Sequence, residues 1–163
     1  MDVWNRMLVL SIGGALGVNA RYWLSVALTR WTGPRFPWAT FAINVTGSFA
    51  IGVLAVVLAH RWPHPLGRLF IVVGFLGGYT TFSSFAFESF TLWEKGDRGL
   101  SLANTFGSVV AGTAAVVVGV AVGRALVGSP VEGERLVRSD VVQRADAVEL
   151  APESFLDGEV EDG

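Results

Sequence analysis

Neutral hydrogen-bond donors and phenyl rings alternate in residues 74–88, with the sequence GFLGGYTTFSSFAFE, inside an otherwise apolar stretch. Hydroxyls of Ser83 and Ser84 stand between the rings of Phe82 and Phe85. Uncharged donors of this kind can replace the water around a small anion and still release it, because no fixed positive charge holds the ion. The pattern therefore indicates a path for an anion through a membrane rather than a catalytic centre.

The rings themselves allow two interpretations. Phe82 and Phe85 are three residues apart and share a helix face, where ordinary core or lipid packing accounts for most phenylalanines. A phenyl ring, however, has an electropositive edge and an electronegative face. Since these two rings flank adjacent serines, their edges could also favour a small anion.

Other polar residues fall inside apolar stretches, where each needs a reason because burial of polar groups in lipid is costly. Asn44 could make a hydrogen bond between helices, or its amide could face a pore and donate to an anion. Arg21 could extend to the membrane interface, or place positive potential at a pore mouth. Ser108, with Asn104 one turn earlier, could continue the track of donors.

Glu88 also lies well inside the third apolar stretch. A structural carboxylate that accepts hydrogen bonds from Thr81 or Ser84 is favoured over a proton carrier. The strongest alternative function is a proton-coupled exporter of small cations, which has the same four-helix, dual-topology design. Such a transporter needs a central carboxylate, but the first stretch offers none beyond Asp2, and Glu88 lies away from the middle of its stretch.

An interruption of the third helix is predicted at about residues 77–81. Adjacent glycines, Gly77 and Gly78, precede two β-branched threonines, which is a poor sequence for a continuous helix. Interrupted helices at membrane depth occur only where protein or water surrounds them. The carbonyls and amides freed at such a break become ligands for ions.

Four apolar stretches are long enough to cross a bilayer, which takes about 20 residues. They cover residues 3–28, 38–59, 69–93 and 100–127, and tryptophans mark several of their ends. The chain of 163 residues is 52% hydrophobic and only 16% charged, with a mean hydropathy of +0.51. The sequence thus predicts an all-α, multi-pass protein of the cell membrane, whose four transmembrane helices form a channel domain over residues 1–128.

The charges are unevenly spread between this domain and the remainder. Residues 1–128 carry 9 Lys/Arg and 4 Asp/Glu, whereas residues 129–163 carry 3 Lys/Arg and 10 Asp/Glu. We expect this acidic tail to be disordered, and we expect no nucleic-acid partner. Four spans place both termini on one side, so the basic residues at the two ends should choose the orientation.

These end charges are balanced, four against four. Arg6, Arg61, Arg68 and Arg124 lie on the side of the termini, and Arg30, Arg35, Lys95 and Arg98 lie opposite. A balanced count predicts dual topology and an antiparallel dimer with a twofold axis in the membrane plane. Small residues one turn apart, which allow close helix packing in lipid, recur in every span: Gly13 and Gly17, Ser48 and Gly52, Gly74 and Gly78, and Ala115, Gly119 and Gly123.

Enzyme chemistry is not expected. The chain has no cysteine, which excludes disulfides and thiolate catalysis. Its two histidines, His60 and His64, lie outside the spans, so neither a zinc site nor a nucleophile–base pair with Ser83 is predicted.

Three motifs, one in each of the first three spans, resemble the CrcB/Fluc fluoride channels. They are residues 13–22 (GGALGVNARY), 44–49 (NVTGSF) and 74–85 (GFLGGYTTFSSF), and the resemblance covers about residues 7–127. It implies a dual-topology homodimer with two antiparallel pores, through which fluoride leaves the cytoplasm passively and its toxicity is relieved. Some members of the family work as pairs of different subunits.

The resemblance also implies roles for particular residues. A structural Na⁺ that is not transported would be held at the dimer centre by the backbone carbonyls of Gly77 and Thr80. Departures from the family pattern are Val18, Leu76, Tyr79 and Asn104, none of which removes a donor from the central motif. The implied pore residues are Asn44, Phe82, Phe85, Ser83, Ser84 and Ser108, with Arg21 as the vestibule arginine.

Overall fold

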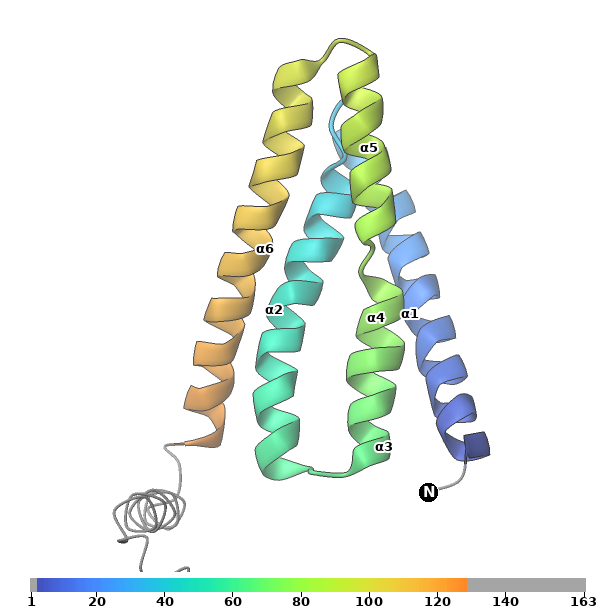
Figure 1. Cartoon of the computed structure of the whole chain (residues 1–163), viewed down its shortest axis with the longest axis vertical. Helices are drawn as coiled ribbons and strands as arrows, with labels where there is room; N and C mark the ends of the chain where they lie inside the picture. The colour runs from blue at the N-terminus through green and yellow to red at the C-terminus, as the bar shows by residue number, and fades with distance from the viewer. Residues whose placement is uncertain (1–2, 129–163) are drawn as a thin grey trace, which may run out of the picture. The chain divides into compact units, whose positions relative to one another are not determined.

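The computed structural model describes residues 3–128, and this part of the chain is helical, with no strand. Four long helical segments run alongside one another, joined by short links (Figure 1). The third of them is built from four consecutive pieces. The elements are α1 (Val3–Thr32), α2 (Trp38–Arg61), α3 (Pro65–Arg68), the π-helix η1 (Leu69–Leu76), α4 (Gly77–Tyr79), α5 (Phe82–Glu94) and α6 (Arg98–Val127).

Two helix pairs form the framework. α2 packs along α6, and α1 packs against η1 and α4, while α5 leans on α6 beyond the interruption (Figure 1). The guanidinium of Arg61 donates a hydrogen bond to the Leu126 carbonyl at 2.6 Å, which joins the C-terminal ends of α2 and α6. The predicted acidic tail, residues 129–163, lies outside the described residues.

Glycines make these close contacts possible, as the recurrent small residues predicted. A Cβ atom on Gly13 would lie 2.7 Å from the Phe70 carbonyl oxygen and 3.2 Å from Gly74 Cα. On the other pair, a Cβ on Gly119 would lie 3.2 Å from Gly52 Cα. α1 therefore meets η1, and α2 meets α6, with backbone almost against backbone.

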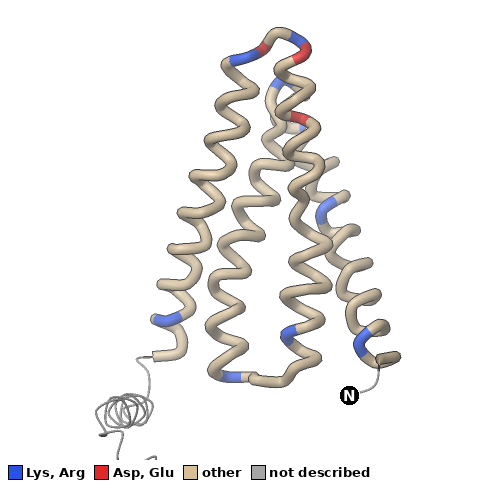
Figure 2. The backbone as a smooth tube through the Cα atoms, in the orientation of Figure 1, with Lys and Arg blue, Asp and Glu red and all other residues tan. Residues whose placement is uncertain are grey.

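Three segments are long and apolar enough to cross a membrane: Trp38–Arg61, Pro65–Glu94 and Arg98–Val127. α1 has 30 residues but does not reach that hydropathy, because polar residues such as Asn19 and Arg21 interrupt its apolar run. The charged residues gather mostly toward the two ends of the helices, which leaves few charges in their middle sections (Figure 2). The chain is therefore a multi-pass membrane protein, with three spans supported by its own composition.

The third segment loses helical geometry at Thr80 and Thr81, within the range 77–81 in which the sequence predicted an interruption. α4 ends at Tyr79, Thr80 has ψ 157° and Thr81 has φ −150° and ψ 113°, and α5 begins at Phe82. Directly before α4 lies the π-helix η1, whose apolar sequence LFIVVGFL gave no sign of it. Such wide turns occur preferentially near functional sites.

Candidate functional site

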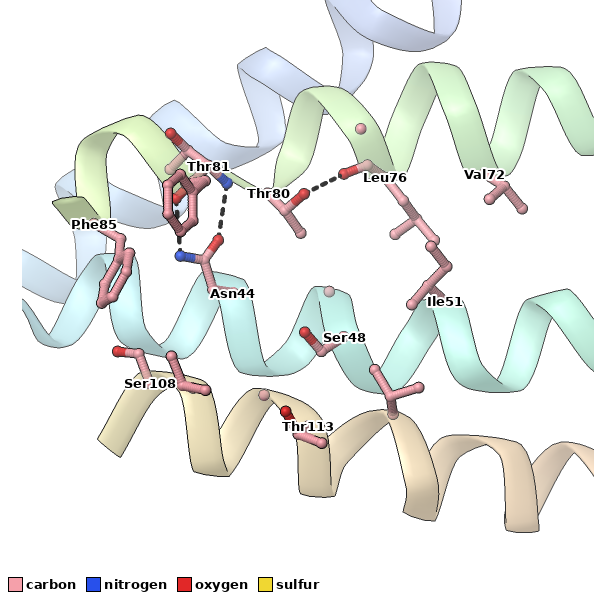
Figure 3. Close-up of a pocket in the computed structure, with 16 residues that line it drawn as sticks. Asn44, Ser48, Ile51, Val72, Leu76, Thr80, Thr81, Phe85, Ser108 and Thr113 are labelled. Carbon is pink, nitrogen blue, oxygen red and sulfur yellow. Dashed lines mark hydrogen bonds between the residues drawn. The ribbon is translucent and has the colours of Figure 1, made fainter. Parts of the chain in front are cut away.

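A cavity of about 450 Å³ opens where the interrupted segment faces α2 and α6 (Figure 3). Asn44, Thr81, Phe85 and Ser108 gather toward one end of it, and the other end is lined by apolar side chains such as Val72 (Figure 3). None of the lining residues carries a formal charge. They are Asn44, Gly47, Ser48, Ile51, Val72, Leu76, Gly77, Thr80, Thr81, Phe82, Phe85, Ser108, Val109, Gly112, Thr113 and Val116.

Asn44 on α2 holds the backbone of the interruption. The Thr81 N–H donates to Asn44 Oδ1 at 2.8 Å, and Asn44 Nδ2 donates to the Thr81 carbonyl at 3.0 Å (Figure 3). In its extended conformation the N–H of Thr81 has no helical partner, and buried backbone groups without partners are costly. Of the two interpretations of Asn44, the hydrogen bond between helices is therefore present. The amide also keeps a second N–H, because an NH₂ group has two hydrogens.

The side chain of Thr81 caps α5. Its Oγ1 accepts from the Ser84 N–H at 3.3 Å and donates to Ser84 Oγ at 3.0 Å. This arrangement is an ordinary N-cap, in which a threonine oxygen satisfies a free amide of the first helical turn. Thr81 thus receives its support from Asn44 and gives support to the helix that carries the phenylalanines.

These bonds leave two carbonyls without their helical partners. In a continuous helix the carbonyls of Gly77 and Thr80 would accept from the N–H groups of Thr81 and Ser84. Those N–H groups bond Asn44 Oδ1 and Thr81 Oγ1 instead. Neither carbonyl accepts any of the backbone hydrogen bonds found in the turns and caps of residues 3–128.

Phe82 and Phe85 both line the cavity but differ sharply in exposure. Phe85 is 8% exposed, whereas Phe82 is 78% exposed. Their ring centroids lie 5.5 Å apart and their planes are tilted by 54°. The two rings therefore form one aromatic wall, in which the ring of Phe85 is buried and that of Phe82 is exposed.

Ser108 reaches the cavity from α6 and belongs to a buried polar network. Ser108 Oγ donates to Asn104 Oδ1 at 3.3 Å, and Asn104 Nδ2 donates to Ser89 Oγ at 2.8 Å. Asn104 is only 1% exposed and does not line the cavity. Asn104 connects α5 to α6. It does not face the cavity, where it would have continued the track of donors that the sequence suggested.

Three predicted site residues do not line this cavity. Ser84 is engaged with Thr81, and Ser83 is exposed, with its Oγ 3.4 Å from Thr81 Oγ1. Arg21 is half-buried on α1, a helix that contributes no residue to the lining. Their predicted roles in an ion path stay predictions.

The prediction that Glu88 accepts a hydrogen bond from Thr81 or Ser84 is wrong. Glu88 Oε1 accepts from Thr40 Oγ1 at 2.8 Å, because Thr81 and Ser84 bond each other. Its Oε2 is buried and finds no hydrogen-bond partner among the residues that the structure describes. Glu88 lines a second pocket of about 310 Å³, between α5 and the link from α1 to α2, and not the cavity at the interruption.

Sequence reasoning missed several polar residues. Ser48 and Thr113 line the cavity, and Thr40 and Ser89 bond Glu88 and Asn104. Ser48 stands one helical turn after Asn44, which was a usable signal for a shared face. Thr40 and Ser89 gave none, because their partners depend on the packing of separate helices.

A helical membrane protein with an interrupted span beside an uncharged cavity is the class that this fold and site define. Residues 8–120 match the family described as CrcB-like protein, Camphor Resistance (CrcB), and the chain belongs to this family. Curated relatives that are similar to this chain carry the name fluoride-specific ion channel FluC. The protein from Nitrobacter winogradskyi is 44% identical over 76% of this chain and 98% of its own length. The protein from Solibacter usitatus is 49% identical over 68% of this chain and 92% of its own length. The protein from Paracoccus denitrificans is 46% identical over 75% of this chain and 97% of its own length.

Proposed function

We propose that this protein is a fluoride-selective, passive ion channel that lets fluoride leave the cytoplasm. The observation that carries the proposal is the interruption at Thr80 and Thr81, held by Asn44 beside a cavity with neutral donors and two phenyl rings. The names of the relatives at 44–49% identity agree with it. Catalysis has no part in this function.

The chemistry of the cavity suits an anion that is small and strongly hydrated. Removing water from such an ion is very costly unless other donors replace it. The second N–H of Asn44, the hydroxyl of Ser108 and the edges of Phe82 and Phe85 can each contribute. Since none of the lining residues is charged, the ion can bind and still leave.

A second subunit completes the path in this proposal. The cavity is open and Phe82 is 78% exposed, so one subunit alone leaves the aromatic wall half uncovered. A second copy in antiparallel orientation would cover it, with α1 as the fourth span. The balanced basic residues at the two ends (Figure 2) support insertion in both orientations; a related but different subunit is the alternative partner.

A structural Na⁺ at the dimer centre fits the residues present. Carbonyl oxygens are suitable ligands for a hard cation, and those of Gly77 and Thr80 have lost their helical hydrogen bonds. A bound cation would supply positive charge that lowers the barrier for an anion nearby. If this assignment is correct, replacing Na⁺ by a large organic cation during purification will weaken the dimer in a size-exclusion experiment.

Fluoride efflux from liposomes tests the function. Purified protein, reconstituted alone, should release fluoride into a bath monitored by a fluoride electrode, and chloride release should stay near that of empty liposomes. Reconstitution alone also decides whether a different partner subunit is needed. Equal rates for fluoride and chloride, or no fluoride release from a properly folded dimer, would refute the proposal.

A further inference from the structure

The buried network behind Ser108 has a fixed direction. Ser89 Oγ donates its only hydrogen to the Phe85 carbonyl at 2.9 Å, so toward Asn104 it can only accept. The NH₂ group of Asn104 must therefore face Ser89, at 2.8 Å, and its Oδ1 must face Ser108. An inverted amide would place two acceptor oxygens against each other.

This direction determines what Ser108 presents to the cavity. Its hydroxyl hydrogen points toward Asn104 Oδ1, and the distance from Ser108 Oγ to that oxygen is 3.3 Å. The lone pairs of Ser108 Oγ are therefore left to face the cavity. Lone pairs repel an anion. Ser108 can donate to an anion only after its hydroxyl turns away from Asn104, and the cost of that turn is set by the hydrogen bond to Asn104.

We propose that Asn104 is a positioning residue that lowers the affinity of the cavity for its anion by holding the hydroxyl of Ser108. Asn104 does not touch the cavity, so it would act through Ser108 alone. This inference rests on the proposed function and adds to it a control over ion affinity that originates in the contact between α5 and α6. Weak holding by a long hydrogen bond is suitable for a channel, which must release its ion.

Two variants release Ser108 in different ways. Asn104→Leu removes the acceptor, and Ser89→Ala removes the acceptor that orients the amide, so the amide can turn its NH₂ toward Ser108 Oγ. In both variants the hydroxyl hydrogen becomes free to face the cavity. A hydrogen bond of about 1 kcal/mol corresponds to about a fivefold change, so the fluoride concentration that gives half-maximal efflux should fall about fivefold in each.

A double-mutant cycle with Ser108→Ala separates this role from a structural one. The shift should disappear when either variant is combined with Ser108→Ala. Ser101→Ala is the matched control, because Ser101 Oγ donates to the Ser89 carbonyl at 2.7 Å across the same helix contact but does not bond Asn104. It should leave the half-maximal concentration unchanged.

Each outcome has a defined meaning. An equal shift in the Ser108→Ala background, or no shift in Ser89→Ala, would overturn the inference while the proposed function stands. Ser89→Ala deletes a single oxygen, so it provides the test even if Asn104→Leu fails to fold. Absence of fluoride efflux from the unsubstituted protein would instead remove the proposed function, and the inference with it.

Discussion

The side-chain amide of Asn44 bonds both backbone polar groups of Thr81, accepting at 2.8 Å and donating at 3.0 Å. The two residues are 37 positions apart, on α2 and in the interruption of the third segment. One side chain therefore replaces the helical hydrogen bond that the Thr81 N–H lacks, adds a bond to the Thr81 carbonyl, and fixes the start of the helix that carries Phe82 and Phe85.

Substitution of Asn44 should affect both stability and transport. Asn44→Leu leaves the N–H of Thr81 without a partner and removes the side-chain bond to its carbonyl, which should lower the free energy of unfolding by about 1–3 kcal/mol. Fluoride efflux should fall by at least about tenfold, since the interruption and a cavity donor are both lost. Denaturant unfolding in detergent and liposome efflux measure the two effects.

Asn19→Ala is the matched control for this change. Asn19 Nδ2 also donates to a backbone carbonyl, that of Ala15 at 2.8 Å, but on an exposed part of α1. Its loss should change stability by less than about 0.5 kcal/mol. Wild-type stability and efflux in Asn44→Leu would show that the interruption does not depend on this amide.

Phe82→Ile should suppress efflux without unfolding the subunit. Phe82 is 78% exposed, so the fold gains little from its ring and stability should change by less than about 0.5 kcal/mol. Loss of an electropositive ring edge at the cavity should reduce fluoride flux by about tenfold or more. Phe90→Ile on the same helix, 57% exposed, is the control and should retain its flux. If the two variants conduct alike, the aromatic wall has no role in conduction.

The long helices were predictable because lipid imposes a length and a hydropathy on each span. The predicted spans end a few residues inside the observed helices, for example residues 38–59 against Trp38–Arg61. Hydropathy marks the part of a helix that contacts lipid, whereas residues with a non-helical backbone conformation determine where the helix ends. Gly33, with φ +75°, follows α1, and Gly96, with φ +86°, follows α5.

The site was predictable by residue type but not by partner. Asn44 stood out because it is a polar residue in an apolar stretch, yet its bond to Thr81 depends on the relative register of two helices, which one sequence does not specify. Glu88 met the same limit, since Thr40, 48 positions away, bonds it instead of a neighbour along its own helix. Local spacing favours partners three or four residues away, and tertiary packing overrides that preference here.

An adjacent pair of glycines tests the packing of α1. Gly13→Ala would bring a Cβ to 2.7 Å from the Phe70 carbonyl, so α1 must move away from η1, at a cost of about 1–3 kcal/mol. Gly14 has open space at the corresponding position, and Gly14→Ala should stabilise the helix by up to about 1 kcal/mol. Unfolding midpoints of the two variants in detergent should therefore shift in opposite directions. Equal shifts would mean that α1 does not contact η1 this closely.

Glu88→Gln separates a channel from a proton-coupled exporter. In the wild-type protein Thr40 Oγ1 donates to Glu88 Oε1 at 2.8 Å. Glutamine retains an oxygen that can accept this hydrogen bond, but it cannot carry a proton. Since Glu88 does not line the cavity, fluoride efflux should stay within about threefold of wild type, a change of less than about 1 kcal/mol. An imposed proton gradient near neutral pH should not drive fluoride efflux in either the wild-type protein or Glu88→Gln. Thr40→Val, by contrast, removes the donor and should destabilise the fold by about 1–3 kcal/mol. Gradient-driven transport that disappears in Glu88→Gln would assign the protein to the exporters instead, with Glu88 as its proton carrier.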